Sequence, residues 1–277
     1  IEDQIIVIER LMMSVDERSR RGFLRGLAGI GFIGAALGFE GIAPASALAS
    51  EELRIALLGD SMIDGIWGGL LRAVQKESCL QGGVKLGRYG MIGTGLTRAD
   101  KFDWTADAKK ILTSFQPELV LVSLGLNDRQ AIVSPTKERT EFNTPEWRAR
   151  YSEATTAFIK SAGAAPAGLL WIGLPSMRDA AAQADAEEKN RIFSEAIQAV
   201  HDPRIEFIEP WRMNASGDEA FQAYGPDASG TRIQIRAGDG IHFTSAGYDM
   251  VAAYLLPKIV AHLQANKIDI AYPCPRG

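Results

Sequence analysis

The stretch Leu53–Met62, with the sequence LRIALLGDSM, constrains the fold more than any other part of the chain. Its first six residues are mostly apolar, which is typical of a short strand buried on both faces of a parallel sheet. The run stops at Gly59, which permits a tight turn, and a helical pattern of apolar residues begins after Ser61. We therefore expect Ser61 at the carboxyl end of a buried strand, where open α/β sheets bind their ligands.

Length and composition fit one α/β domain. The chain has 277 residues, of which 46% are hydrophobic and 23% charged, so it can bury a full core. The net charge is −4, and lysines and arginines form no cluster beyond the N-terminal segment, so we expect no nucleic-acid partner. Two cysteines, three histidines and no CxxC motif are too few ligands for a Cys/His metal site, and we expect no metal and no cofactor.

Residues 1–49 have the features of a cleavable export signal. Arg20 and Arg21 are followed by Phe-Leu and a weakly apolar, glycine-rich run over 26–39, which resembles a bacterial twin-arginine signal, although Arg25 stands where lysine is more common. Ala47-Leu48-Ala49 offers an A-x-A cleavage site. We expect recognition by the twin-arginine export machinery, cleavage after Ala49, a domain over 50–277 and a periplasmic location.

Two alternatives to cleavage remain for this segment. A membrane anchor is disfavoured, because the apolar run of about 14 residues is shorter than the roughly 20 needed to cross a bilayer. An uncut signal is the other alternative. Met12 and Met13 lie just upstream of the arginines, and we expect translation to start near Met13.

The two cysteines allow two interpretations. In an oxidising compartment Cys79 and Cys274 could form a disulfide, but their separation in space does not follow from the sequence. A free, buried Cys79 is an equally good interpretation.

Strand and helix patterns alternate from residue 53 to about 265. This alternation predicts a parallel sheet covered by helices on both faces, a three-layer α/β/α sandwich. We expect five strands, at Leu53–Leu58, Val84–Tyr89, Leu119–Leu124, Leu169–Gly173 and Ile205–Ile208. We expect helices after Ser61, around Lys109–Phe115, over Glu146–Ala162 and Ala184–Val200, and from Thr244, as N-cap, to about Ala265.

Two inserts interrupt the alternation. Arg129–Pro145 is polar and rich in turn residues. In Asn214–Gly240 the turn sequence Pro226–Gly230 precedes the alternating run TRIQIR, which predicts a hairpin at the carboxyl edge of the sheet.

Three further loops carry residues that could meet Ser61 at one sheet edge. A serine hydroxyl is a weak nucleophile until an imidazole accepts its proton, and that imidazole needs a carboxylate to hold its tautomer. His242 and Asp239, three residues apart before the last helix, could supply both groups. The N–H groups of Ser61 and Gly95 and the amide of Asn127 could bind the oxyanion that forms in acyl transfer.

Each residue taken singly has a structural explanation. Ser61 could be only an N-cap, and Gly93 and Gly95 simple turn residues. Asn127-Asp128 could close a turn, His242 could be a half-buried structural histidine, and Asp239 could cap Ile241 or Thr244. Only the conjunction of these residues favours catalysis.

The conjunction resembles a known superfamily. Gly59-Asp60-Ser61, Gly95, Gly125-x-Asn127-Asp128 and Asp239-x-x-His242, in this order, resemble the four sequence blocks of the SGNH (GDSL-type) hydrolases. The local sequences around Phe102, Asn127 and Asp239 are similar to those of an exported bacterial branch of this superfamily, described only as a domain of unknown function. The resemblance implies a flavodoxin-like sheet of order 2-1-3-4-5, with Ser61 as nucleophile, His242 as base and Asp239 as its orienting acid. It also implies an oxyanion hole formed by Ser61, Gly95 and Asn127, with Gly93 as the competitor of Gly95, and a structural role for Asp60.

The functional prediction is a periplasmic serine esterase that removes a small acyl group, for example acetyl, from a carbohydrate or related ester. An O-acyltransferase acting on a periplasmic glycan uses the same residues and is the close alternative, and a non-catalytic carbohydrate-binding domain is another. Arg129 and Arg236 are candidates for binding an anionic or sugar substrate, with a surface ion pair as an equally good explanation for each. Neither the acyl chain length nor the oligomeric state follows from the sequence.

Overall fold

A five-stranded parallel sheet forms the centre of the domain. The computed structural model describes residues 52–212, 221–227 and 229–274, all within one compact unit over 49–277. The strands are β1 (Leu53–Gly59), β2 (Val84–Gly90), β3 (Leu119–Ser123), β6 (Leu169–Ile172) and β7 (Ile205–Ile208). They pair in the order β2-β1-β3-β6-β7, each with a parallel neighbour, which confirms the predicted order 2-1-3-4-5.

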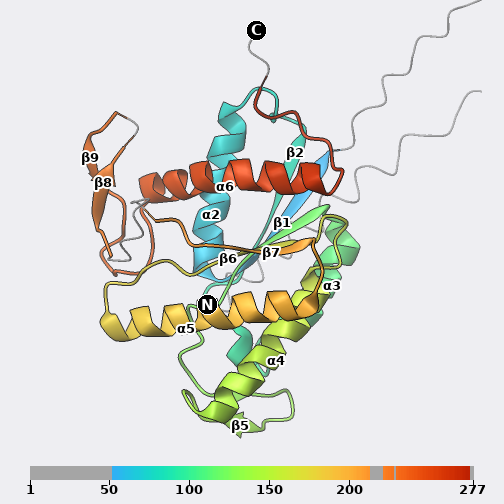
Figure 1. Ribbon diagram of the computed structural model, residues 1–277, viewed down its shortest axis with the longest axis vertical. Helices are drawn as coiled ribbons and strands as arrows, with labels where there is room; N and C mark the ends of the chain where they lie inside the picture. The colour runs from blue at the N-terminus through green and yellow to red at the C-terminus, as the bar shows by residue number, and fades with distance from the viewer. Residues whose placement is uncertain (1–51, 213–220, 228, 275–277) are drawn as a thin grey trace, which may run out of the picture. The chain divides into compact units, whose positions relative to one another are not determined.

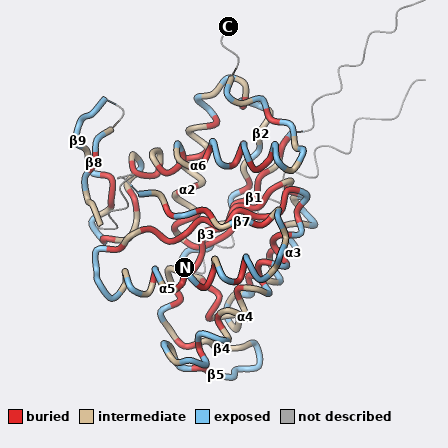
Figure 2. The backbone as a smooth tube through the Cα atoms, viewed as in Figure 1, coloured by how far each residue is buried: buried red, intermediate tan, exposed pale blue. Residues whose placement is uncertain are grey.

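Helices cover both faces of the sheet, as predicted. One layer consists of α2 (Ser61–Lys76) and α6 (Ser245–Ala265), which pack against each other. The other consists of α3 (Trp104–Phe115), α4 (Pro145–Ala162) and α5 (Ala180–Val200). Figure 1 shows the helices arranged around the strands. The inner strands β1, β3 and β6 are almost entirely buried, whereas the edge strand β2 is largely not (Figure 2). β3 is buried at every residue, as the apolar run Leu119–Val122 predicts.

Side-chain caps determine where the helices begin. Asp60, Asp103, Thr144, Asp179 and Thr244 each precede a helix and accept a hydrogen bond from a backbone N–H in its first turn. The cap at Asp179 places the start of α5 four residues before the predicted Ala184. The run Ala180–Ala182 lacks the apolar periodicity that would have indicated a helix from sequence.

Each insert contains a short hairpin. In the second insert, β8 (Tyr224–Pro226) pairs antiparallel with β9 (Arg232–Gln234), so the predicted hairpin is present. It stands beside the first turn of α6, at the end of the domain toward which the sheet strands point (Figure 1). In the first insert, β4 (Ile132–Val133) pairs with β5 (Arg139–Thr140), a hairpin that the polar sequence did not predict.

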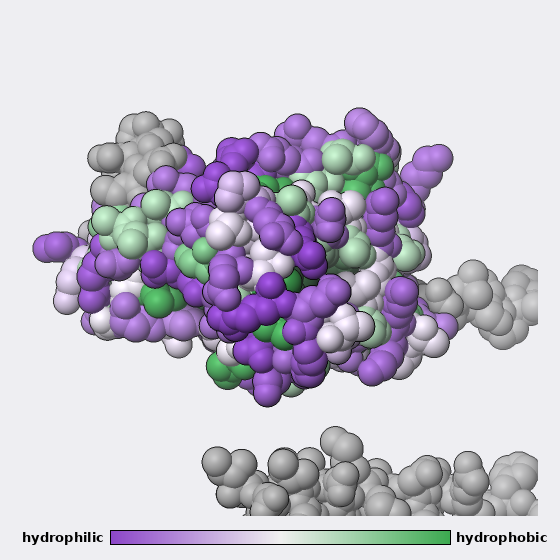
Figure 3. Space-filling model, turned by 90° about the horizontal axis from the view of Figure 1, so that it is seen from below, coloured by the Kyte–Doolittle hydropathy of each residue, from purple (hydrophilic) through white to green (hydrophobic). Residues whose placement is uncertain are grey.

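The surface is mostly hydrophilic on the face that includes α4 and the β4–β5 hairpin. Figure 3 shows only scattered hydrophobic patches there. Among the described residues, none of the helices is both long enough and apolar enough to span a bilayer. The predicted signal over 1–49 and its cleavage site after Ala49 lie outside the described residues.

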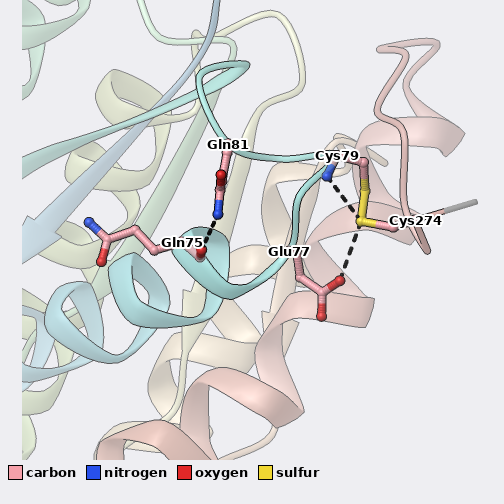
Figure 4. Close-up of a disulfide and its surroundings, with 5 residues drawn as sticks. All are labelled: Gln75, Glu77, Cys79, Gln81 and Cys274. Atoms are coloured by element: carbon pink, nitrogen blue, oxygen red, sulfur yellow. Dashed lines mark hydrogen bonds between the residues drawn. A yellow bond between two sulfur atoms is a disulfide. The ribbon is translucent and has the colours of Figure 1, made fainter.

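Cys79 and Cys274 form a disulfide (Figure 4). It joins the segment that follows α2 to the C-terminal end of the described chain, across a sequence separation of 195 residues. Of the two interpretations of the cysteines, the structure shows the paired one.

Reduction of this disulfide should destabilise the domain. A bond that closes so long a loop restricts the unfolded chain strongly, and loss of a native disulfide costs about 2–5 kcal/mol. We expect thermal unfolding with a reductant to occur several degrees lower than without it. A Cys79→Ser/Cys274→Ser variant should melt at the lower temperature and show no response to the reductant. An unchanged melting temperature of the reduced wild-type protein would contradict this prediction.

Candidate active site

Ser61 is the first residue of α2 and lies directly after β1. Gly59 makes the turn between them, with a φ of +153° and a position so close to β3 that a Cβ would lie 1.9 Å from the carbonyl oxygen of Ser123. Only glycine fits there. The register of the sheet pairs Gly59 with Gly90 on β2 and with Ser123 on β3. The loops that follow these three strands therefore leave the sheet side by side, with Ser61 at their edge.

Ser61, His242 and Asp239 form a continuous hydrogen-bonded chain. The Oγ of Ser61 lies 2.7 Å from Nε2 of His242, and Nδ1 of the same ring lies 2.7 Å from Oδ2 of Asp239. A ring with its proton on Nδ1 donates to the carboxylate and leaves Nε2 free to accept from the serine hydroxyl. The three residues predicted as nucleophile, base and orienting acid thus have the geometry of a serine triad.

The short loop before α6 holds Asp239 in its ionised form. Burial alone would raise the pKa of this carboxyl, but the ring of His242 and the backbone N–H groups of Ile241 and His242 donate hydrogen bonds to it and lower the pKa to about 2. The two backbone bonds are 2.8 and 3.0 Å long. These bonds also explain why Asp239 and His242 are three residues apart. Oδ1 accepts the two backbone hydrogen bonds of the turn, and Oδ2 is left to face the imidazole.

Asp60 is fully buried and connects two loops. One carboxylate oxygen accepts from the N–H of Met62, and the other accepts from the N–H groups of Gly125 and Leu126. Burial raises the pKa of Asp60 to about 6, and the nearby charge of Asp128 adds to the rise, while the three N–H donors oppose it. The side chain ties the start of α2 to the loop after β3 and makes no contact with the imidazole. The contacts agree with the structural role that the resemblance implies.

Asp128, for which the sequence motifs indicated no role, holds the loop that carries Gly95. Its carboxylate is fully buried and accepts from the N–H groups of Leu96 and Thr97, from the Thr97 hydroxyl at 2.6 Å and from the Tyr151 hydroxyl at 2.8 Å. Burial raises the pKa of Tyr151 well above its usual value, so this phenol is a neutral donor. A Cβ on Gly95 would lie 2.1 Å from Asp128 Oδ1, which explains the glycine.

The candidate oxyanion donors lie on these same loops. Gly95 is buried, whereas its competitor Gly93 is exposed at the turn, which favours Gly95. The backbone N–H groups of Ser61 and Gly95 donate to no other group in the described part of the chain. The Asn127 amide donates one hydrogen bond to the carbonyl of Thr94, at 2.8 Å, and this bond leaves its second N–H for a ligand.

Arg129 and Arg236 already have partners within the protein. Arg129 forms an ion pair with Asp185, the alternative that the sequence left open. Arg236 is 3% exposed and donates to the carbonyls of Ser176 and Ile241, at 2.8 and 2.6 Å. Its guanidinium also lies 4.3 Å from the ring of Phe243. Burial lowers the pKa of Arg236 to about 10, so it stays charged. These contacts favour a structural role for Arg236, as a support for the loop that carries His242.

Lys189 of α5 is a buried cation that the sequence did not indicate. It is 3% exposed, and burial lowers its pKa, against the opposing charges of Asp128 and Asp185. In the sequence AEEKNR it resembles an ordinary solvent-facing lysine. Within the described residues, no cluster of His, Cys, Asp and Glu could hold a metal ion.

Solved structures share this architecture. A carbohydrate esterase family 3 from Talaromyces cellulolyticus is 16% identical, with a TM-score of 0.52 over 78% of this chain and 98% of that one. Axe2, an acetylxylan esterase from Geobacillus stearothermophilus, is 17% identical, with a TM-score of 0.50 over 76% and 95%. LAE5, an alpha/beta hydrolase enzyme from the metagenome of Lake Arreo, Spain, is 16% identical, with a TM-score of 0.50 over 79% and 97%.

The sheet order and these neighbours give the chain the flavodoxin-like, three-layer α/β/α fold that was predicted from its sequence. The chain belongs to the family described as "Protein of unknown function (DUF459)", whose model matches residues 54–258. The predicted membership in a branch of unknown function is thereby confirmed. None of the curated proteins matches the chain in sequence.

The buried carboxyl of Asp60 should titrate at an unusually high pH. Its folded pKa of about 6 lies above the unfolded value of 3.8. Its contribution to stability is therefore fully present below about pH 4 and is lost as the pH rises through 6. Carboxyl ¹³C NMR should show a resonance with a midpoint near pH 6 that is absent from an Asp60→Asn variant. The resonance of Asp239 should show no titration until about pH 2. A midpoint near 4 for Asp60 would contradict the prediction.

Proposed function

We propose that this protein is a serine ester hydrolase that removes a small acyl group, such as acetyl, from a carbohydrate through an acyl-enzyme. The observation that carries the proposal is the continuous chain from the Ser61 hydroxyl through His242 to Asp239, with 2.7 Å at each step. Serine is activated in this way for acyl transfer. The free N–H groups of Ser61 and Gly95, together with the Asn127 amide, support the same chemistry because they can stabilise an oxyanion.

The first half of the reaction forms the acyl-enzyme. Ser61 Oγ attacks the ester carbonyl carbon while Nε2 of His242 accepts the hydroxyl proton, and the carbonyl oxygen becomes an oxyanion held by the N–H donors. The bond to the alcohol oxygen then breaks, and the imidazolium returns the proton to that oxygen. Asp239 stays ionised throughout, since its pKa of about 2 is far below neutral pH, and stabilises the imidazolium.

The second half returns the enzyme to its starting state. Water takes the place of the alcohol and gives a proton to His242 as its oxygen attacks the acyl carbon. The second tetrahedral intermediate collapses, the bond to Ser61 Oγ breaks, and Oγ regains the proton from the imidazolium. The products are a carboxylic acid and the free serine.

The carbohydrate substrate class is supported by the fold neighbours that are named carbohydrate esterase and acetylxylan esterase. We further propose that the reaction takes place in the periplasm after twin-arginine export. The twin-arginine motif at Arg20–Arg21 and the disulfide between Cys79 and Cys274 support this location, because disulfides persist in oxidising compartments.

Loss of Ser61 or His242 should abolish ester hydrolysis. By analogy with serine proteases, Ser61→Ala and His242→Ala should each lower kcat for nitrophenyl acetate by about 10⁶-fold. A fluorophosphonate probe should label the wild-type protein and leave Ser61→Ala unlabelled. Ser114→Ala and His201→Ala, at exposed positions on α3 and after α5, are matched controls that should keep full activity.

Three results would count against the proposal. A His242→Ala protein that keeps most of its rate would reject the assignment of the base. Absence of labelling at Ser61 in the wild-type protein would favour a non-catalytic binding domain. Acyl-glycan formation in excess of hydrolysis, when an acyl donor and a glycan are supplied together, would assign the protein as an O-acyltransferase.

The amide of Asn127 should contribute to the rate without contributing to binding of the ground state. Removal of one oxyanion donor costs roughly 10²–10³ in kcat. We expect Asn127→Ala to lower kcat by this factor at a nearly unchanged KM in nitrophenyl acetate hydrolysis. Gln130→Ala is the control. It removes a neighbouring amide that donates to the backbone carbonyl of Asn127, and it should lower kcat much less. An equal loss in both variants would indicate general loosening of the loop.

A further inference from the structure

A cleft of about 520 Å³ lies beside the candidate active site, and neither Ser61 nor His242 lines it. One wall is the polar face of α5. The others are the segment Leu174–Ser176 after β6, Phe207 in β7 with Glu209–Arg212 after it, Gln222, and the pair Ile235–Arg236. The volume is within the range of small-ligand sites in proteins, about 300–1,000 Å³. The cleft opens at the carboxyl ends of β6 and β7, which is the side of an α/β sheet where ligands bind.

The cleft shares a wall with the loop that carries His242. Ser176 and Arg236 line the cleft, and the Arg236 guanidinium donates to the carbonyls of Ser176 and Ile241. Arg236 therefore connects the wall of the cleft to the loop that carries His242.

The lining is largely fixed before any ligand binds. The Asn190 side chain accepts from the N–H of Leu174 at 2.8 Å and donates to its carbonyl at 2.9 Å, which holds the segment after β6 against α5. The ring of Trp211 packs edge-on against Phe243, with 5.8 Å between centroids. A preorganised site loses less conformational freedom on binding.

The chemistry of the lining selects a neutral, hydroxyl-rich ligand. Among the described residues that line the cleft, three arginines and three glutamates balance each other. Arg191 bonds Glu195 at 2.7 Å, Arg212 lies 4.0 Å from Glu209, and Arg236 is committed to carbonyls. The lining also contains the rings of Phe207 and Trp211 and the polar groups of Ser194, Gln198 and Gln222.

Aromatic faces offer the apolar contact that the C–H face of a sugar ring needs, and amides and hydroxyls offer both donors and acceptors. An anionic polymer would need unpaired cations, and the described residues of the lining present none. We propose that this cleft is a glycan-binding subsite, separate from the acyl site, that takes a neutral oligosaccharide segment of the substrate. The substrate class in this inference rests on the proposed function. The location of the subsite rests on the cleft.

The test measures binding without turnover. Ser61→Ala protein is titrated calorimetrically with xylohexaose, cellohexaose, mannohexaose and chitohexaose, and with an oligogalacturonate as an anionic probe. We expect at least one neutral hexaose to bind and Trp211→Ala, in the Ser61→Ala background, to weaken that binding at least about tenfold, since buried aromatic anchors dominate binding free energy. Trp67→Ala, on α2 in the other helix layer, is the matched control and should bind as the parent does.

Two further measurements keep the outcome interpretable. Ser194→Tyr, which adds a ring inside the cleft without removing a core side chain, should also weaken binding and covers the case in which Trp211→Ala does not fold. The thermal unfolding of each variant should match that of its Ser61→Ala parent, so that a loss of binding reports on the cleft and not on unfolding.

Failure of the two proposals can be told apart. Binding of a neutral hexaose that depends on Trp211, in a protein without esterase activity, would support the subsite and reject the proposed hydrolase. Esterase activity without binding of any neutral hexaose would reject the subsite and leave the hydrolase in place. Equal binding by the Trp211, Ser194 and control variants, or preference for the oligogalacturonate, would also reject the subsite.

Discussion

Two buried carboxylates hold the site together. Asp60 and Asp128 have no access to solvent, and each accepts hydrogen bonds from backbone N–H groups of a loop other than its own. Asp60 joins the start of α2 to the loop after β3, and Asp128 joins that loop to the one after β2. Burial of charge is costly unless the charge is satisfied, and these bonds offset part of that cost. The consequence is that Ser61, Gly95 and Asn127 occupy fixed positions relative to one another before any substrate arrives.

The sequence predicted the layers of the fold and the Asp239–His242 pair because both are encoded locally, whereas Ser61 was added to that pair by the conjunction of motifs. The apolar runs of the five strands and the alternation with helices determine the layers, and Asp239 and His242 lie within one short turn. The sheet order came from the resemblance to the SGNH hydrolases, since strand pairing is not readable from single segments. The roles of the three triad residues stay predictions, although their atoms lie where those roles require.

What the sequence did not reveal depends on tertiary packing. Arg236 stands in an alternating run that reads as an exposed hairpin strand, yet the chain returns over it and buries its guanidinium among three carbonyls and an aromatic ring. Lys189 and Asp128 have ordinary local sequences and become unusual only because distant segments enclose them. The cleft lined by Trp211 could not be predicted either, because its walls come from five separate parts of the chain.

The disulfide between Cys79 and Cys274 bears on the order of folding, export and oxidation. It closes a ring that contains nearly all of the domain. The twin-arginine route carries folded proteins, so export by this route would require the sheet and its helices to assemble first in a reducing cytoplasm, with the C-terminal segment still untethered. The covalent closure would then be the last step of maturation and would distinguish molecules that have crossed the membrane from those that have not.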